Sequence, residues 1–134
     1  MLRNIVATIV GVLVAGLVVG LVESINMFLF PPPPGIDLHD PKQVAAMVST
    51  LPMQAFVIVL FAWSLGCFCG GWIATRLAPS RPATPAVIVA AFILAGVVYN
   101  VVALPHPLWM SIAGLLLPLP STLLGARLAG WRRA

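Results

Sequence analysis

The chain has 134 residues, of which 61% are hydrophobic and 7% are charged, and its formal net charge is +4. An ordinary soluble domain carries about 25% charged residues, so this composition excludes a water-soluble globule and predicts an integral membrane protein. The positive charge does not indicate nucleic-acid binding, because the basic residues lie at the ends of apolar runs, where they set the orientation of a membrane protein.

Four apolar runs each approach the roughly 20 residues that cross the hydrocarbon core of a bilayer as a helix. They span about residues 5–30, 53–75, 86–104 and 108–126, within a single transmembrane domain, 1–134. The first run is too long for a signal peptide and no A-x-A-like site follows it, so we expect a retained first helix. The predicted fold class is all-α, a polytopic four-helix bundle in the lipid bilayer.

Basic residues gather at the N-terminus, between the second and third spans and at the C-terminus, whereas the first loop, residues 31–52, carries Asp37, Asp40 and Lys42. The residues at the first three places are Arg3, Arg76, Arg81, Arg127, Arg132 and Arg133. By the positive-inside rule, both termini are expected in the cytoplasm and the first loop outside.

The first loop begins with four prolines, Pro31 to Pro34, which favour a stiff extended spacer. Asp40 then precedes a proline and is expected to cap a short helix, with Gln43 reaching back in the manner of a capping box. The apolar stripe that follows consists of Val44, Met47, Val48 and Leu51. These patterns predict a short helix that lies on the membrane surface or over the mouth of the bundle.

Pro118 and Pro120 lie halfway along the fourth span. An interior proline removes a helical hydrogen bond and clashes with the preceding turn, so these two are expected to kink or break the helix. A packed kink is one interpretation, and a broken helix that marks a binding site is the other.

Small residues recur every fourth position in the first two spans, the pattern by which membrane helices approach closely. They are Gly16 and Gly20 in the first span and Ala62, Gly66, Gly70 and Ala74 in the second. We therefore expect these two helices to cross tightly and this face to mediate contacts within the bundle or in a homo-oligomer or larger membrane complex. Glu23 and Asn26 are expected on the side of Gly16 and Gly20.

Polar residues gather at the expected outer ends of the spans. At a rise of ~1.5 Å per residue, Glu23 lies roughly 27 Å from the inner end of its span and Asn100 roughly 21 Å, and His106 begins the last span at the same level. A carboxylate in hydrocarbon costs on the order of 3 kcal/mol, so Glu23 is expected to be protonated, paired or hydrated.

Three interpretations of Glu23 follow. It locks the register of the helices by accepting hydrogen bonds from Asn26, Asn100 or Gln54 or by pairing with His106; it binds a ligand or ion together with His106, with Asp37, His39 and Asp40 on the access route; or it exchanges a proton in a carrier. The chain has no catalytic motif and no metal-ligand spacing, so we expect no enzyme, no catalytic residue, no bound metal and no cofactor.

An acid near the end of the first helix combines with a P-P-x-G-x-D-like loop, with "GCFCGGW" in the second span and with "PHPLW" before the fourth. In this combination the chain resembles small four-helix bacterial inner-membrane proteins of uncharacterised function, which implies localisation in the inner membrane. It is also similar to small multidrug resistance transporters in size, helix number and a Glu on the first helix. It departs from them in the depth of Glu23, the proline-rich loop and the proline-interrupted fourth span.

The function that these features favour is a non-catalytic membrane protein, an accessory, assembly or binding module with a polar cluster around Glu23. A small ion- or proton-coupled transporter or channel that uses Glu23 is the alternative.

Overall fold

The computed structural model describes residues 1–80 and 82–131, and every regular element in these two ranges is an α-helix. Four segments are long and apolar enough to cross a membrane: α1, Leu2–Leu29; α3, Met53–Leu77; α4, Thr84–Ala103; and the pair α5, Leu108–Leu116, and α6, Pro118–Leu128. A short helix, α2, Pro41–Ser49, lies in the first loop. The predicted all-helical bundle with four spans is confirmed.

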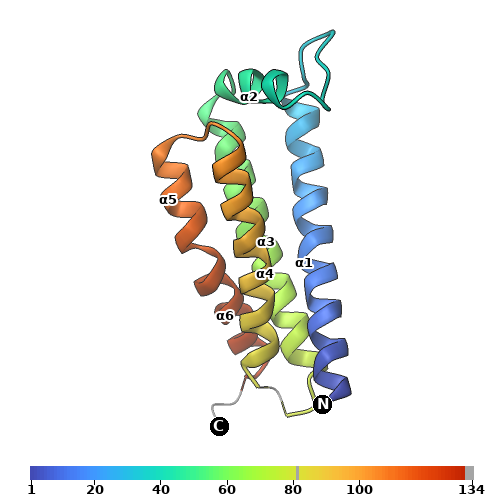
Figure 1. Cartoon of the computed structure of the whole chain (residues 1–134). Helices are drawn as coiled ribbons and strands as arrows, with labels where there is room; N and C mark the ends of the chain where they lie inside the picture. Colours follow the sequence, from blue (N-terminus) through green and yellow to red (C-terminus); the bar gives the residue numbers. More distant parts are fainter. Residues whose placement is uncertain (81, 132–134) are drawn as a thin grey trace.

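The spanning helices stand side by side, and α2 lies across one end of the bundle (Figure 1). The N-terminus and the end of α6 lie together at the opposite end. We name the two ends of the bundle the α2 half and the terminal half. Helix α3 contacts α1, α4, α5 and α6 and is therefore the centre of the bundle. Arg81, Arg132 and Arg133, on which the predicted orientation partly rests, lie outside the described residues.

The contact between α1 and α3 is close because both helices present small residues. On α3 these are Ala62, Gly66, Gly70 and Ala74, all of them buried. A methyl group added at Gly66 would lie 2.8 Å from the carbonyl oxygen of Ala15, and one added at Gly11 would lie 2.6 Å from Cβ of Ala74. The two backbones are therefore nearly in contact, as the spacing of small residues predicts.

The residues on α1 that make this contact are Ala7, Gly11 and Ala15, which are all buried. The expectation that Gly16 and Gly20 pack within the bundle is wrong, because both are exposed and, among the described residues, no other helix comes within 4 Å of a methyl group added at either. Successive residues are turned by about 100° around a helix axis, so Gly16 faces away when Ala15 faces α3. A role for the two glycines between subunits stays a prediction.

The fourth span is divided at Leu117, as Pro118 and Pro120 predict. The residue keeps a helical backbone, φ −75 and ψ −32, and its N–H donates to the carbonyl of Ala113 at 2.9 Å. The prolines have no N–H to offer to the carbonyls of the preceding turn, but α5 and α6 remain joined by a kink without unwound backbone. Of the two interpretations, the packed kink is the one that the structure shows.

Each half has its own apolar core. In the terminal half it consists of the small residues Ala15 and Ala74 with Val89. In the α2 half it consists of larger residues, Val48, Phe56, Trp63, Val97 and Met110. The α2 half, which has the larger core side chains, also contains the candidate site.

Candidate functional site

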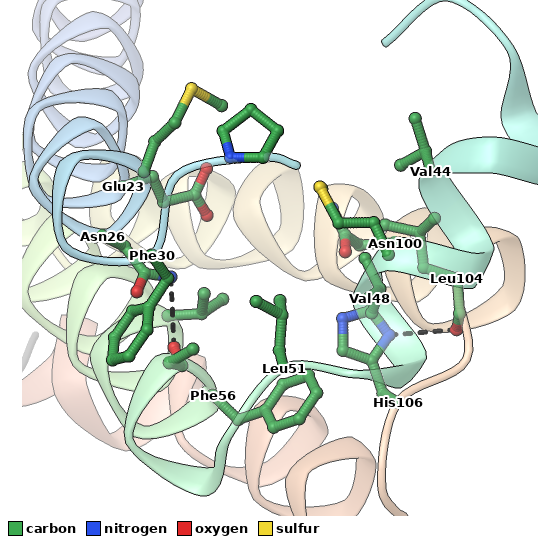
Figure 2. A pocket seen from close by; sticks show the side chains of 15 residues that line it. Glu23, Asn26, Phe30, Val44, Val48, Leu51, Phe56, Asn100, Leu104 and His106 are labelled. Atoms are coloured by element: carbon green, nitrogen blue, oxygen red, sulfur yellow. Dashed lines mark hydrogen bonds between the residues drawn. The ribbon is translucent and has the colours of Figure 1, made fainter. Parts of the chain in front are cut away.

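A pocket with a volume of about 230 Å³ lies in the α2 half, beneath α2 and between the spanning helices (Figure 2). Four polar residues line it: Glu23 and Asn26 from α1, Asn100 from α4, and His106 from the segment before α5. The remaining lining residues are Met27, Phe30, Pro32, Val44, Met47, Val48, Leu51, Ala55, Phe56, Val59 and Leu104. The structure thus brings together Glu23, Asn100 and His106, which the sequence places at one depth, and adds Asn26 to them.

Glu23 is half-buried, at the border between the packed face of α1 and the exposed face that carries Gly16. Its Oε1 accepts a hydrogen bond from Nε1 of Trp63 at 3.2 Å. Trp63 is only 5% exposed, and its ring rests against Gly114, where an added methyl group would lie 2.6 Å from Cζ3. Gly114 on α5 therefore leaves room for the indole of Trp63 on α3. From this position the indole reaches Glu23 on α1.

Asn26 forms a second link between α1 and α3. Its Nδ2 donates to the backbone carbonyl of Ala55 at 3.2 Å (Figure 2). Because a carbonyl oxygen only accepts, this bond fixes which way the amide is turned. The other amide atom, Oδ1, is buried and has no hydrogen-bond partner in the described residues.

His106 is held by its own loop. Its Nδ1 lies 3.0 Å from the carbonyl oxygen of Leu104, and since that oxygen only accepts, Nδ1 carries a proton. In the neutral ring Nε2 then has a free lone pair, and no bond to it is formed within residues 1–80 and 82–131. The ring packs edge-on against Phe56, with ring centroids 6.0 Å apart and an interplanar angle of 64°.

Asn100 completes the polar lining. Its backbone carbonyl accepts from the N–H of Leu104 at 3.0 Å, which ends α4 next to the pocket. Its side-chain amide forms no hydrogen bond within the part of the chain that the structure describes. Each of the four polar residues thus retains at least one unused hydrogen-bonding position.

Helix α2 covers the pocket with Val44, Met47 and Val48 of the predicted apolar stripe, and Leu51, just beyond the end of the helix, continues the stripe. The carboxylate of Asp40 caps the helix by accepting from the N–H of Lys42 at 3.0 Å and from Nε2 of Gln43 at 3.1 Å. Val48 is only 7% exposed and packs in the core of the α2 half. The predicted short helix in the first loop is confirmed, and it lies over the mouth of the bundle.

The other loop residues that we considered for the site do not line the pocket. Asp37 accepts from the N–H of His39 at 2.9 Å, and its own N–H donates to Oε1 of Gln43 at 2.9 Å. The side chain of His39 is 98% exposed and lies 3.4 Å from the carboxylate of Asp37. Together with the cap Asp40, these residues shape the loop that leads to α2.

Sequence reasoning missed Trp63 and the aromatic residues Phe30 and Phe56. Trp63 follows Ala62 and precedes Gly66 by three positions, so it lies next to the small-residue face that packs on α1. A buried indole N–H needs a hydrogen-bond acceptor, and Trp63 lies beside this face, so its position in the sequence could have indicated a bond to Glu23 on the neighbouring helix.

The arrangement offers hydrogen-bond acceptors, one carboxylate and an apolar wall, which together suit the binding of a small molecule. Among the described residues, no group of three or more His, Cys, Asp or Glu side chains is placed to hold a metal ion. Comparisons of the chain with protein-family models, with curated proteins and with solved structures gave no match.

Proposed function

We propose that this protein is a non-catalytic membrane binding module whose pocket takes up a small molecule at the α2 end. One observation carries the proposal: four polar side chains with unused hydrogen-bonding positions converge on one largely apolar pocket. Ligand sites have this composition, with an apolar wall and a few polar groups that orient the ligand.

A purely structural role for the polar cluster accounts for only part of it. The bonds from Trp63 to Glu23 and from Asn26 to Ala55 do link α1 to α3. However, the side-chain amide of Asn100 and Nε2 of His106 take no part in these two links, although both residues line the pocket. A ligand in the pocket offers partners to these groups, whereas a structural link between α1 and α3 leaves them unused.

The packing of the terminal half favours a binding module over a channel or carrier. A methyl group added at Gly70 would lie 2.7 Å from the carbonyl oxygen of Gly11 and 2.9 Å from Val89. One added at Gly71 would overlap the carbonyl oxygen of Thr122. The backbones of α1, α3 and α6 therefore leave little space between them on the side opposite the pocket.

The orientation and the assembly belong to the same proposal. With the basic residues inside, the pocket opens to the outer face of a bacterial inner membrane and both chain ends lie in the cytoplasm. The exposed glycines of α1, Gly16 and Gly20, are the face that we propose for contact with a second copy or with another membrane subunit.

The test uses three one-ring probes that differ in charge: 2-phenylethanol, 2-phenylethylammonium and 3-phenylpropionate. We expect at least one of them to raise the thermal unfolding temperature of the protein in phosphatidylcholine nanodiscs. At ten times its Kd, a ligand contributes about 1.4 kcal/mol, which corresponds to a few °C.

Two substitutions on α2 form a matched pair for this test. Val44→Phe adds bulk to the wall of the pocket and is expected to abolish the shift, whereas Ala46→Phe adds the same ring to the exposed side of α2 and is expected to keep it. If no probe stabilises the parent protein, or if Val44→Phe responds like Ala46→Phe, the proposal is wrong.

A further inference from the structure

The unused positions in the pocket are mainly hydrogen-bond acceptors. Oε1 of Glu23 is occupied by Trp63, but Oε2 accepts no bond within the described residues. Asn26 donates one N–H to the carbonyl of Ala55, and its Oδ1 is buried out of reach of an occupant. His106 donates the proton on Nδ1 to the backbone carbonyl of Leu104, which leaves the lone pair of Nε2 as an unused acceptor. An occupant that satisfies these atoms must donate hydrogen bonds.

Asn100 is compatible with the same occupant. Its amide forms no hydrogen bond with residues 1–80 or 82–131, so rotation about its last side-chain torsion presents either the oxygen or the NH₂ group to the pocket. It therefore adds a third acceptor without changing the packing of α4.

The pocket also has one negative group without a countercharge. Among the described residues, Glu23 is the only Asp, Glu, Lys or Arg side chain that lines it. Across the described residues, the one ion pair is that between His39 and Asp37 in the exposed loop. A carboxylate in such apolar surroundings is costly unless it is paired, and a positively charged occupant provides the missing partner.

The remaining lining favours an organic cation. The wall contains Phe30, Phe56, Met27 and Met47, and aromatic rings attract cations through their faces. The volume of about 230 Å³ exceeds the ~150 Å³ of a cavity that holds benzene and falls below the ~300 Å³ at which pockets for drug-sized ligands begin. The pocket therefore has room for an occupant whose apolar part is one ring or a short alkyl chain.

We propose that the pocket binds a small primary ammonium compound, with the charged nitrogen beside Glu23 and the apolar body against Phe30 and Phe56. This inference rests on the proposed function, since it names the chemical class of the ligand. A primary ammonium group donates three hydrogen bonds and carries one positive charge, which matches the vacant acceptors and the single carboxylate. Two sources supply this group: a free amine and the ethanolamine headgroup of a phospholipid.

The experiment measures Kd for the three one-ring probes by calorimetry, with the protein in phosphatidylcholine nanodiscs, whose headgroup has no N–H. We expect 2-phenylethylammonium to bind at least about tenfold more tightly than 2-phenylethanol, and 3-phenylpropionate to bind more weakly than both. Equal binding of the amine and the alcohol, or preference for the carboxylate, overturns the ammonium inference and leaves the proposed function standing. Absence of binding by all three overturns both.

Glu23→Gln and Ser24→Ala sharpen the result. Glutamine keeps an oxygen for the N–H of Trp63 but removes the charge, so we expect it to abolish the preference for the amine over the alcohol. Ser24 is exposed and bonds only to the carbonyl of Gly20 in its own helix, so its variant is expected to keep the preference. A preference that persists in Glu23→Gln contradicts the inference. The comparison of probes on the parent protein remains decisive where that variant does not fold.

Nanodiscs that contain phosphatidylethanolamine distinguish the two sources. If the headgroup is the natural occupant, it competes, and the apparent Kd of 2-phenylethylammonium rises at least about tenfold relative to phosphatidylcholine alone. If a free amine is the occupant, the Kd stays the same. Each result supports the ammonium class and assigns its source.

Discussion

The two halves of the bundle are closed by different means. In the terminal half, Gly11, Gly70, Gly71 and Gly125 bring helix backbones together until a methyl group no longer fits. In the α2 half, large side chains such as Phe56 and Trp63 fill the space, and polar groups remain unpaired around a pocket. Lipid tails are as apolar as leucine, so membrane helices associate mainly through close packing. This difference agrees with our proposal that the terminal half stabilises the bundle and that the α2 half binds a ligand.

The largest effect is expected from Gly125→Ala in the terminal half. The added methyl group would overlap the carbonyl of Phe68 and lie 3.1 Å from the backbone nitrogen of Trp72. Backbone atoms do not rotate away, so α6 must separate from α3, and we expect a loss of about 3 kcal/mol or more of unfolding free energy. Unfolding in mixed detergent micelles measures it.

The control is Gly96→Ala on the exposed side of α4, where no other helix within the described part of the chain comes within 4 Å of the added methyl group. We expect its stability to stay unchanged or to rise by up to about 1 kcal/mol, because alanine is the better helix former. If both alanine variants unfold alike, close packing does not distinguish the two halves.

A smaller effect is expected from Gly114→Ala in the α2 half. Here the added methyl group meets the ring of Trp63, a side chain that shifts more easily than backbone. We expect a loss of about 1–2 kcal/mol and a displaced indole that no longer donates to Glu23. Unfolding in the same micelles measures the loss, and a changed tryptophan emission spectrum reports the displacement. A loss as large as that of Gly125→Ala would contradict the contrast between the halves.

The link from Trp63 to Glu23 is measured by a double-mutant cycle with Trp63→Phe and Glu23→Leu. A hydrogen bond to a charged group contributes about 1.5–3 kcal/mol to stability, and at 3.2 Å we expect a coupling energy of about 1–2 kcal/mol. The cycle cancels the packing that each substitution loses separately. A coupling energy below about 0.5 kcal/mol would show that Glu23 serves the pocket without stabilising the bundle.

The fold was predictable because the length of an apolar run shows whether it can cross the membrane, and prolines mark where the helices begin and end. The polar lining was predictable for a related reason. Rise per residue is nearly constant in a helix, so Glu23, Asn100 and His106 could be placed at one level by counting alone. The cap at Asp40 and the stripe on α2 are likewise local patterns.

The face that each helix turns toward its neighbour could not be predicted by counting residues. The first span contains two sets of small residues spaced four apart, Ala7–Gly11–Ala15 and Gly16–Gly20. Spacing does not decide which set meets α3, because that depends on the shape of the partner. The position of the Trp63 ring was unpredictable for the same reason, since it depends on the space that Gly114 leaves on α5.

The smallest effect on global stability is expected from Asp40→Ala at the start of α2. Loss of an N-cap costs about 1 kcal/mol, but here it loosens only the helix over the pocket and leaves the packing of the spanning helices intact. We therefore expect faster hydrogen exchange in α2 with an unfolding midpoint of the bundle close to that of the parent. Lys42→Ala, at an exposed position in the first turn of the same helix, is the matched control and should leave the exchange unchanged. A lowered midpoint for Asp40→Ala would mean that α2 is part of the stabilising core, because a separate cover opens without weakening the bundle beneath it.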